Sequence, residues 1–311
     1  MLCYTGRTMR SRILIIGAGG RIGRAFVHIF SAASAGDGAT VIDLCDSDTA
    51  ACPVQLPLEE TVPQADIIVL CVYSWVMREV LEKITPLLKK DAVIISLAKG
   101  IEKNSYKTMD VVLAEVVGTR AAWGVVSGPM LAEEILQGGG SAGVVASLDS
   151  RVFEKLQALV QPADLLLLAS TDVRGIALAG VLKNVYALVL GIADGLGWGA
   201  NRKGWLISAA AREMESIMTR LGGAAETVEG PAVIGDLVAC SFSPLSRNRT
   251  TGETLVKTGE LNPKSEGAIS LDSLIALLGE TSAEFPLLRA VRAIALEHKP
   301  AAAIFENLLH V

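Results

Sequence analysis

The feature that most constrains the fold is a short apolar run near the start of the chain that leads directly into a glycine-rich turn. Residues 12–16 have the continuous apolar pattern of a strand buried on both faces. The turn Gly17-Ala18-Gly19-Gly20-Arg21-Ile22-Gly23 follows, and an amphipathic helix is expected from there to about Ser34. This order favours a βαβ unit that binds a dinucleotide, because glycines let the backbone approach a pyrophosphate and the helix N-terminus faces its charge.

The spacing of this turn departs from the plain G-x-G-x-x-G pattern of such units. It is either G-x-x-G-x-x-G or G-x-G with one extra residue before the last glycine. The strand before the turn and the helix after it still support the cofactor interpretation. The candidate cofactor-binding residues of the turn are Gly17, Gly19, Gly20, Arg21, Ile22 and Gly23.

A carboxylate at the end of the expected second strand, residues 40–45, bears on the choice of cofactor. Asp46 follows this strand, and a carboxylate there usually takes the ribose hydroxyls of NAD and repels the extra phosphate of NADP. Asp43 is a competing candidate, since the sequence does not fix the register of the strand. Arg21 and Arg24 leave NADP open as well. The sequence therefore predicts NAD or NADP, with Asp46 favouring NAD.

Strand-like and helical runs alternate along the next part of the chain, which predicts a parallel sheet with crossover helices. Ligands bind beyond the carboxyl ends of the strands in such sheets. Tyr73, Lys99 and Gly128 follow three of the runs and are therefore expected on the same edge as Gly17 and Asp46, although Lys99 also suits an ordinary surface turn. The strand-like runs are residues 66–72, 92–97, 123–126, 141–147 and 165–170, and the helical runs are residues 77–88, 107–116 and 151–160.

The pattern changes after Thr171, where long apolar-periodic stretches replace the strands. We expect helices over residues 175–195, 203–222, 271–278 and 285–298, and we expect residues 252–267 to be the most loop-like part. The predicted fold class is α/β, a Rossmann-like, mostly parallel sheet followed by an all-α C-terminal domain. The expected division is a dinucleotide-binding domain over residues 1–174 and a substrate-binding, catalytic domain over residues 175–311.

A lysine and an asparagine interrupt the most apolar of these helical stretches. Lys183 and Asn184 are the only strongly polar pair between Gly175 and Gly191. A lysine that is buried and loses its proton easily can serve as an acid or base near neutral pH. A lysine that extends along a partly exposed helix to reach water is the ordinary alternative.

Composition excludes several classes of function. The chain of 311 residues carries a formal net charge of −5, whereas nucleic-acid and membrane-surface proteins usually show a basic excess. Its five cysteines form no C-x-x-C pair or metal-type spacing, which is typical of a reducing compartment. The longest wholly apolar run, residues 185–193, is too short to span a bilayer. We expect a cytoplasmic protein that binds no metal, nucleic acid or membrane.

Three polar clusters lie between the expected helices of the second domain. Asp236 and Ser246 each suit a helix N-cap, and Arg247 with Asn248 suits a solvated surface. The functional alternative is an anion site, because an arginine fork and an amide at a helix start bind phosphate well. The clusters are Asp194 to Asn201, Gly235-Asp236-Leu237 and Ser243-Pro244-Leu245-Ser246-Arg247-Asn248-Arg249.

Together these motifs resemble the NAD(P)-dependent glycerol-3-phosphate dehydrogenase family, the bacterial type in particular. The resemblance covers nearly all of the chain. The Lys-Asn block and the block from Ser243 to Arg249, in this order, are its most specific parts. It also rests on Lys99-Gly100-Ile101-Glu102, Ser127-Gly128-Pro129, Ala193-Asp194-Gly195-Leu196-Gly197 with Asn201, and Gly235-Asp236-Leu237.

The resemblance implies reversible reduction of dihydroxyacetone phosphate to sn-glycerol 3-phosphate, which feeds glycerophospholipid synthesis, and a homodimer. It implies that Lys183 exchanges the proton and that Lys99 polarises the carbonyl and touches the cofactor. Charge that develops on the carbonyl oxygen then meets ammonium groups, and bringing two lysines together should lower the pKa of at least one. The implied catalytic residues are Lys183, Lys99, Asp236 and Asn184; the substrate-binding residues are Lys99, Gly128, Ser246, Arg247 and Asn248; further cofactor contacts are Tyr73, Lys99, Ala132, Arg247 and Glu266.

The chain departs from the family pattern in the glycine turn, at Met130 and at Ala239, where the family has hydroxyl residues at the last two positions. Two alternatives therefore stay open. One is a 3-hydroxyacid-type dehydrogenase in which Arg247 binds a carboxylate, and the other is a dinucleotide-binding sensor without turnover. Dehydrogenases of the 2-hydroxyacid type need a histidine, and His28, His298 and His310 all lie outside the expected site.

Overall fold

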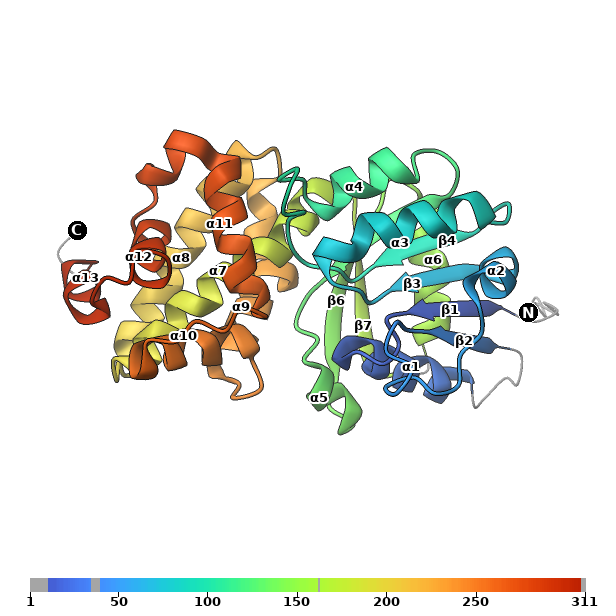
Figure 1. Ribbon diagram of the computed structural model, residues 1–311, viewed down its shortest axis with the longest axis horizontal. Helices are drawn as coiled ribbons and strands as arrows, with labels where there is room; N and C mark the ends of the chain where they lie inside the picture. The colour runs from blue at the N-terminus through green and yellow to red at the C-terminus, as the bar shows by residue number, and fades with distance from the viewer. Residues whose placement is uncertain (1–10, 35–39, 162, 309–311) are drawn as a thin grey trace, which may run out of the picture.

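The computed structural model describes residues 11–34, 40–161 and 163–308, and shows a sheet region followed by a helical region (Figure 1). One seven-stranded sheet has the order β2-β1-β3-β4-β5-β6-β7. Every neighbouring pair is parallel except β5 and β6. The predicted fold class is confirmed. The strands are β1 (Arg12–Ile16), β2 (Val41–Cys45), β3 (Ile67–Leu70), β4 (Val93–Ser96), β5 (Ala122–Ser127), β6 (Ser141–Ala146) and β7 (Leu165–Ser170).

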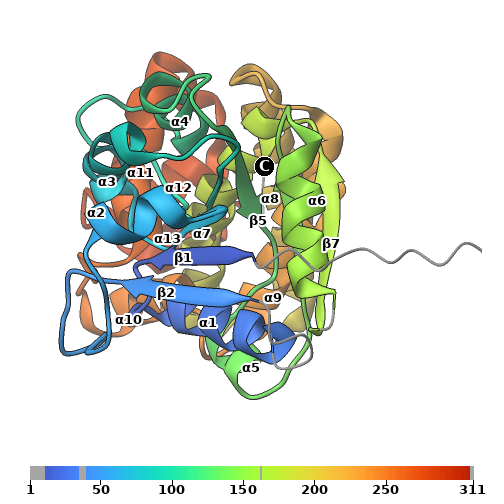
Figure 2. The ribbon, with the colours of Figure 1, turned by 90° about the vertical axis from the view of Figure 1, so that its right-hand side faces the viewer.

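Helices cover both faces of the sheet, which is why its central strands are apolar at successive positions. In β1, Ile13 and Ile15 face one hydrophobic core, and Leu14 and Ile16 face the other. The first core is completed by α1 (Arg21–Ser34), α5 (Ala132–Leu136) and α6 (Ser150–Val160). The second is completed by α3 (Met77–Ile84), α4 (Met109–Val116) and helices of the C-terminal region. Figure 2 shows α1 and α6 on the face opposite α3 and α4.

The C-terminal helices are arranged around α7 (Val173–Gly195), which carries the Lys-Asn pair. Nearly every residue of α7 from Gly175 to Ala193 is buried. The wholly apolar run of residues 185–193 is part of this longer helix, and α7 as a whole could cross a membrane by length and composition. It is nevertheless the core helix of this region, since its most apolar window is entirely buried. The other helices include α8 (Ala200–Arg220), α9 (Asp236–Phe242), α10 (Arg247–Thr258), α11 (Glu266–Leu278), α12 (Pro286–Ala295) and α13 (Ala301–Leu308).

The predicted loop over residues 252–267 is wrong in its first half, because α10 continues to Thr258. Its sequence lacks apolar periodicity because backbone contact with α7 replaces large side chains. A Cβ added to Gly252 would lie 2.2 Å from the Leu188 carbonyl oxygen, and one added to Gly191 would lie 1.9 Å from the Arg249 carbonyl oxygen. These two glycines therefore let the helices approach closely. The short helix α13 was not predicted.

Candidate active site

The largest concentration of predicted site residues lines a cavity of about 270 Å³ between the sheet and the C-terminal helices. Its walls come from the glycine turn, from the segments after β3, β4 and β5, and from α7, α10 and α11. The predicted site residues on its wall are Gly20, Arg21, Ile22, Tyr73, Lys99, Ala132, Lys183, Asn184, Ser246, Arg247, Asn248 and Glu266. The other predicted residues, Gly17, Gly19, Gly23, Asp46, Gly128 and Asp236, are not part of this wall.

The glycine turn has the geometry that brings α1 close to the end of β1. Gly17 has a φ of 85°, which favours glycine, and its N–H donates to the Cys45 carbonyl oxygen at 2.8 Å. A Cβ on Gly23 would lie 2.1 Å from the Gly17 carbonyl oxygen. The extra residue of the motif therefore does not prevent a strand–turn–helix unit. The N-terminus of α1 begins at Arg21 and faces the cavity.

The two candidate aspartates near β2 have different environments. Asp43 is buried within the strand, and its carboxylate is paired with Arg12. Asp46 follows the strand, and its Oδ2 accepts a hydrogen bond from the Gly19 N–H at 2.8 Å. Asp46 is thus the carboxylate beside the glycine turn, whereas Asp43 is occupied by an ion pair.

Two lysines converge on one carboxylate at the base of the cavity. Asp236, the first residue of α9, is 1% exposed. Its Oδ2 lies 2.9 Å from Lys99 Nζ and 3.0 Å from Lys183 Nζ. Lys99 Nζ also donates to the Gly128 carbonyl oxygen at 3.4 Å. Two ammonium groups share one carboxylate, which leaves a net positive charge where an anion or a developing oxyanion is favoured.

Glycines make room for this arrangement. A Cβ on Gly180 of α7 would lie 2.9 Å from Lys99 Cγ, so the bare helix surface accommodates the lysine side chain. Gly128 has a φ of 148°, and a Cβ there would lie 2.5 Å from the Ala142 carbonyl oxygen. Both glycines therefore help to hold Lys99 over Asp236.

The two lysines have pKa values that shift in opposite directions. Burial, together with the neighbouring Lys183 ammonium, lowers the pKa of Lys99 despite its contact with Asp236. Burial also disfavours the charged form of Lys183, but the Asp236 carboxylate and the Cys240 sulfur outweigh it and raise its pKa. Burial would raise the pKa of Asp236, yet the two lysines lower it. The prediction that at least one lysine has a lowered pKa is confirmed, for Lys99 rather than for Lys183.

A buried amide network joins three helices beside the lysines. Asn248 Nδ2 donates to Asn184 Oδ1 at 2.7 Å. Asn248 Oδ1 accepts from Ser265 Oγ at 2.7 Å and from the Gly267 N–H at 3.0 Å. The side chain of Asn248 therefore fixes α10 against α7 and the start of α11. Its acceptor atom is already in use, and only its amide nitrogen has a proton left to offer.

The N-terminus of α10 presents the predicted anion-binding residues to the cavity. Ser246 is the N-cap, and its Oγ accepts from the Arg249 N–H at 3.4 Å. Arg247 is exposed and lines the cavity. A capped helix start with an arginine beside it is well suited to an anion such as phosphate.

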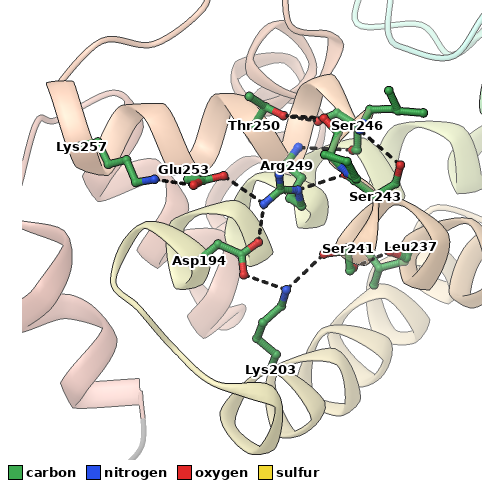
Figure 3. Close-up of polar contacts among 12 residues, drawn as sticks. Asp194, Lys203, Leu237, Ser241, Ser243, Ser246, Arg249, Thr250, Glu253 and Lys257 are labelled. Carbon is green, nitrogen blue, oxygen red and sulfur yellow. Dashed lines mark hydrogen bonds and ion pairs between the residues drawn. The ribbon is translucent and has the colours of Figure 1, made fainter. Parts of the chain in front are cut away.

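A network of ion pairs and hydrogen bonds links α10 to the end of α7 and to α8 (Figure 3). Arg249 Nη1 lies 2.7 Å from Asp194 Oδ2, and its Nε donates to the Ser243 carbonyl oxygen at 3.1 Å. Lys203 Nζ lies 2.7 Å from Asp194 Oδ1 and donates to the Ser241 carbonyl oxygen at 3.1 Å. Asp194 at the end of α7 therefore anchors the connection between α9 and α10.

Glu266 at the start of α11 reaches the opposite wall of the cavity. Ser74 Oγ donates to Glu266 Oε2 at 3.5 Å. Burial raises the pKa of Glu266 to about 7. Beside it, Tyr73 stacks on Trp75 with ring centroids 4.2 Å apart, and both rings are partly exposed.

Sequence reasoning missed two charged residues of the wall, Glu133 and Lys264. Glu133 lies in the first turn of α5 and is paired with Arg21. The sequence did contain an indication that Glu133 lies at the cofactor site, since it directly follows Ala132, a predicted cofactor contact. Met130, which replaces a hydroxyl residue of the family pattern, also lines the cavity, whereas Ala239 does not. The change at Met130 therefore bears directly on the cavity.

Comparisons with known proteins agree with this geometry. Residues 50–153 match the family described as NAD-dependent glycerol-3-phosphate dehydrogenase N-terminus, and residues 172–306 match its C-terminus. The matched regions begin after the glycine turn and Asp46. Within them lie both lysines, Asp236 and the start of α10.

Individual relatives carry the same name. An NAD(P)+ glycerol-3-phosphate dehydrogenase of Geobacter sulfurreducens is 37% identical over 78% of this chain and 76% of that protein. One from Streptomyces coelicolor is 39% identical over 79% of this chain and 76% of that protein. The fold also matches the crystal structure of glycerol-3-phosphate dehydrogenase from Coxiella burnetii with a TM-score of 0.84. That match covers 97% of this chain and 99% of the other, at 26% sequence identity. The chain belongs to the NAD-dependent glycerol-3-phosphate dehydrogenase family.

Proposed function

We propose that this chain is an NAD(P)-dependent glycerol-3-phosphate dehydrogenase that reversibly reduces dihydroxyacetone phosphate to sn-glycerol 3-phosphate. The observation that carries the proposal is the pair of lysines held by one buried carboxylate in a cavity that also meets the glycine turn. Lys99 and Lys183 lie 2.9 Å and 3.0 Å from Asp236 Oδ2. Ketone reduction needs positive charge at the carbonyl oxygen and a proton for it, and two ammonium groups supply both.

The residues around the glycine turn fit a dinucleotide. Gly20 and Arg21 line the cavity at the N-terminus of α1, where backbone N–H groups favour a pyrophosphate. Asp46 beside the turn would take ribose hydroxyls, so NAD is favoured over NADP as the finer choice. Tyr73, Ala132 and Glu266 would line the remainder of the cofactor site. When bound, the reduced nicotinamide supplies a hydride to the carbonyl carbon of the substrate.

The lysine pair provides the proton and the electrostatic stabilisation. Because Asp236 raises the pKa of Lys183, this residue remains an ammonium and can donate a proton from Nζ to the carbonyl oxygen. Lys99 is the second positive charge at this oxygen, and its lowered pKa makes it the lysine that first loses its proton as the pH rises. In the oxidation direction, a neutral amine must accept the hydroxyl proton. We therefore infer that the chain favours reduction at neutral pH and oxidation at alkaline pH.

The start of α10 binds the phosphate in this proposal. Three donors at the helix N-terminus would bind this anion: the hydroxyl of Ser246, the guanidinium of Arg247 and the remaining amide proton of Asn248. Asn184 would act chiefly by orienting Asn248, since its Oδ1 accepts from Asn248 Nδ2. Gly128 would act through its carbonyl group, which accepts from Lys99.

We further propose a division of labour between residues 1–174, which hold the cofactor, and residues 175–311, which hold the substrate. Residues 1–10, 35–39, 162 and 309–311 of these ranges lie outside the described structure. The protein is proposed to work in the cytoplasm as a homodimer. Light scattering should then give a mass of twice 32.6 kDa.

The experiment that tests the proposal is the loss of reduced-nicotinamide absorbance on adding dihydroxyacetone phosphate, with NADH and NADPH in parallel. Two other ketones serve as comparisons: dihydroxyacetone, which lacks the phosphate, and acetoacetate, which carries a carboxylate. We expect rapid oxidation with the phosphorylated ketone and rates lower by about a hundredfold or more in kcat/KM with the other two, because they lack the charged phosphate contacts. Faster turnover of acetoacetate would instead favour a 3-hydroxyacid-type dehydrogenase.

A further inference from the structure

The glycine turn carries a charged side chain whose partner comes from a distant part of the chain. Arg21 is the first residue of α1, and its Nε donates to Glu133 Oε1 of α5. Both side chains line the cavity and are partly buried, 29% and 28% exposed. The guanidinium of Arg21, at the helix N-terminus where the pyrophosphate is proposed to bind, is therefore already bound to a carboxylate.

The carboxylate of Glu133 is only partly satisfied by this contact. Its Oε2 is buried and has no hydrogen-bond partner among the described residues. Burial would raise the pKa of Glu133, but the hydrogen bond from Arg21 and the charge of Arg247 outweigh it and lower the pKa. A charged carboxylate is therefore paired with Arg21, the arginine of the cavity wall that is expected at the cofactor.

A carboxylate in this place conflicts with the ligands that the cavity is proposed to bind. A pyrophosphate at the N-terminus of α1 needs the positive end of the helix and the adjacent guanidinium. Glu133 competes for that guanidinium and repels a second anion at short range. Arg21 Nη2 also donates to the Leu245 carbonyl oxygen at 3.3 Å, so the same side chain reaches the segment just before α10.

We propose that Glu133 is a built-in competitor for the cofactor: its carboxylate holds Arg21 in the free protein, and the dinucleotide binds by exchanging this carboxylate for its pyrophosphate. The inference rests on the proposed function, since it requires a dinucleotide in the cavity. Arg21 is then a cofactor-binding residue whose contribution to cofactor affinity is limited by Glu133. The neighbouring Glu134 is exposed and does not line the cavity, so it provides a matched control.

Calorimetric titration of the full chain with NADH, or with NADPH if that binds the unmodified protein more tightly, tests this proposal at fixed ionic strength. Glu133→Gln keeps the shape of the side chain and removes its charge. We expect it to tighten binding about three- to tenfold, the range for loss of one partly exposed competing ion pair. Glu134→Gln should change the affinity less than about twofold, as expected for a solvated charge.

The double variant identifies the route of the effect. Arg21→Gln should weaken binding, and adding Glu133→Gln to it should give no further gain, because the competition acts through Arg21. Weaker or unchanged binding in Glu133→Gln, with an unaltered circular dichroism spectrum, would overturn the proposal. A gain that persists without Arg21 would also overturn it. If the unmodified protein binds neither reduced cofactor, the proposed function itself fails. If it binds the cofactor and only the Glu133→Gln result differs from expectation, the competitor proposal alone fails.

Discussion

At the scale of single residues, the site depends on how one carboxylate is shared by two amines. Asp236 contacts both lysines, yet burial and the second ammonium lower the pKa of Lys99, whereas the pKa of Lys183 is raised. The sequence predicted that two lysines would meet and that one would lose affinity for its proton. The interpretation of Lys183 as the lysine that easily loses its proton was wrong, because the Asp236 carboxylate and the Cys240 sulfur, 3.4 Å from Lys183 Nζ, raise its pKa.

Asp46 gives the first prediction at this scale. Asp46→Asn keeps an acceptor for the Gly19 N–H but removes the negative charge that would repel a 2′-phosphate. We expect the ratio of kcat/KM for NADH over NADPH to fall about tenfold. Asp48→Asn is the control, because this exposed aspartate lies in the same turn and accepts only from local backbone groups. An unchanged ratio in Asp46→Asn would remove Asp46 from cofactor selection.

Glu266 gives a prediction about stability and pH. Its pKa is raised to about 7 by burial, whereas the unfolded chain loses this proton near pH 4.3. The contribution of Glu266 to the free energy of unfolding therefore falls as the pH rises from about 4.3 to about 7. Above about pH 7 the loss of stability is complete and constant. Glu266→Gln should raise the free energy of unfolding by about 1–3 kcal/mol at pH 8 and change it little at pH 4.

Denaturant titration without nucleotide measures this difference. Glu260→Gln is a suitable control, since Glu260 is exposed in the loop before α11. An equal gain at both pH values would show that the effect of Glu266→Gln comes from something other than its charge.

At the scale of elements, the strands were predictable and the helix that carries the proposed anion site was not. The strand β1 is apolar at successive positions because both of its faces are buried. The helix α10 has no such pattern, because it is packed through Gly252 and held by polar contacts. The side chain of Asn248 is hydrogen-bonded to Asn184, 64 positions before it, and to Ser265, 17 positions after it. Pairings over these distances depend on the fold and cannot be deduced from local spacing.

The ion-pair network behind α10 gives the prediction at this scale. Asp194→Asn removes the anion between Lys203 and Arg249, whose side chains are only 9% and 14% exposed. We expect the free energy of unfolding to fall by about 2–4 kcal/mol, because the buried Lys203 loses its carboxylate and Arg249 keeps only Glu253 as an ion-pair partner. We also expect KM for dihydroxyacetone phosphate to rise more than kcat falls, since the network holds α10, which carries the proposed phosphate site, whereas Lys99 and Lys183 are held by Asp236.

Lys257→Met provides the control for this network. Lys257 is its outermost member, paired with Glu253 and 58% exposed, so its loss should alter KM less than about twofold. A fall in kcat without any change in KM for Asp194→Asn would contradict the positioning role.

At the scale of the whole molecule, the cavity is made by two regions that meet only after folding. The sheet region contributes the glycine turn and Lys99, and the C-terminal helices contribute Lys183 and the start of α10. Figure 1 shows the two regions next to each other. The strands of the sheet and twelve of the residues that line the cavity could be predicted from the sequence and the family resemblance. The Arg21–Glu133 pair could not, because it joins residues 112 positions apart on different helices.

The central claim is that Lys183 donates the proton while the rest of the site binds ligands. Its most direct test is the reduction of dihydroxyacetone phosphate by Lys183→Met, measured as kcat beside the dissociation constant for the reduced cofactor. Lys103→Met, at an exposed surface lysine, is the control. We predict a loss of about a hundredfold or more in kcat with cofactor binding nearly unchanged. A kcat within about tenfold of the unmodified protein, judged against that expected loss, would contradict the account.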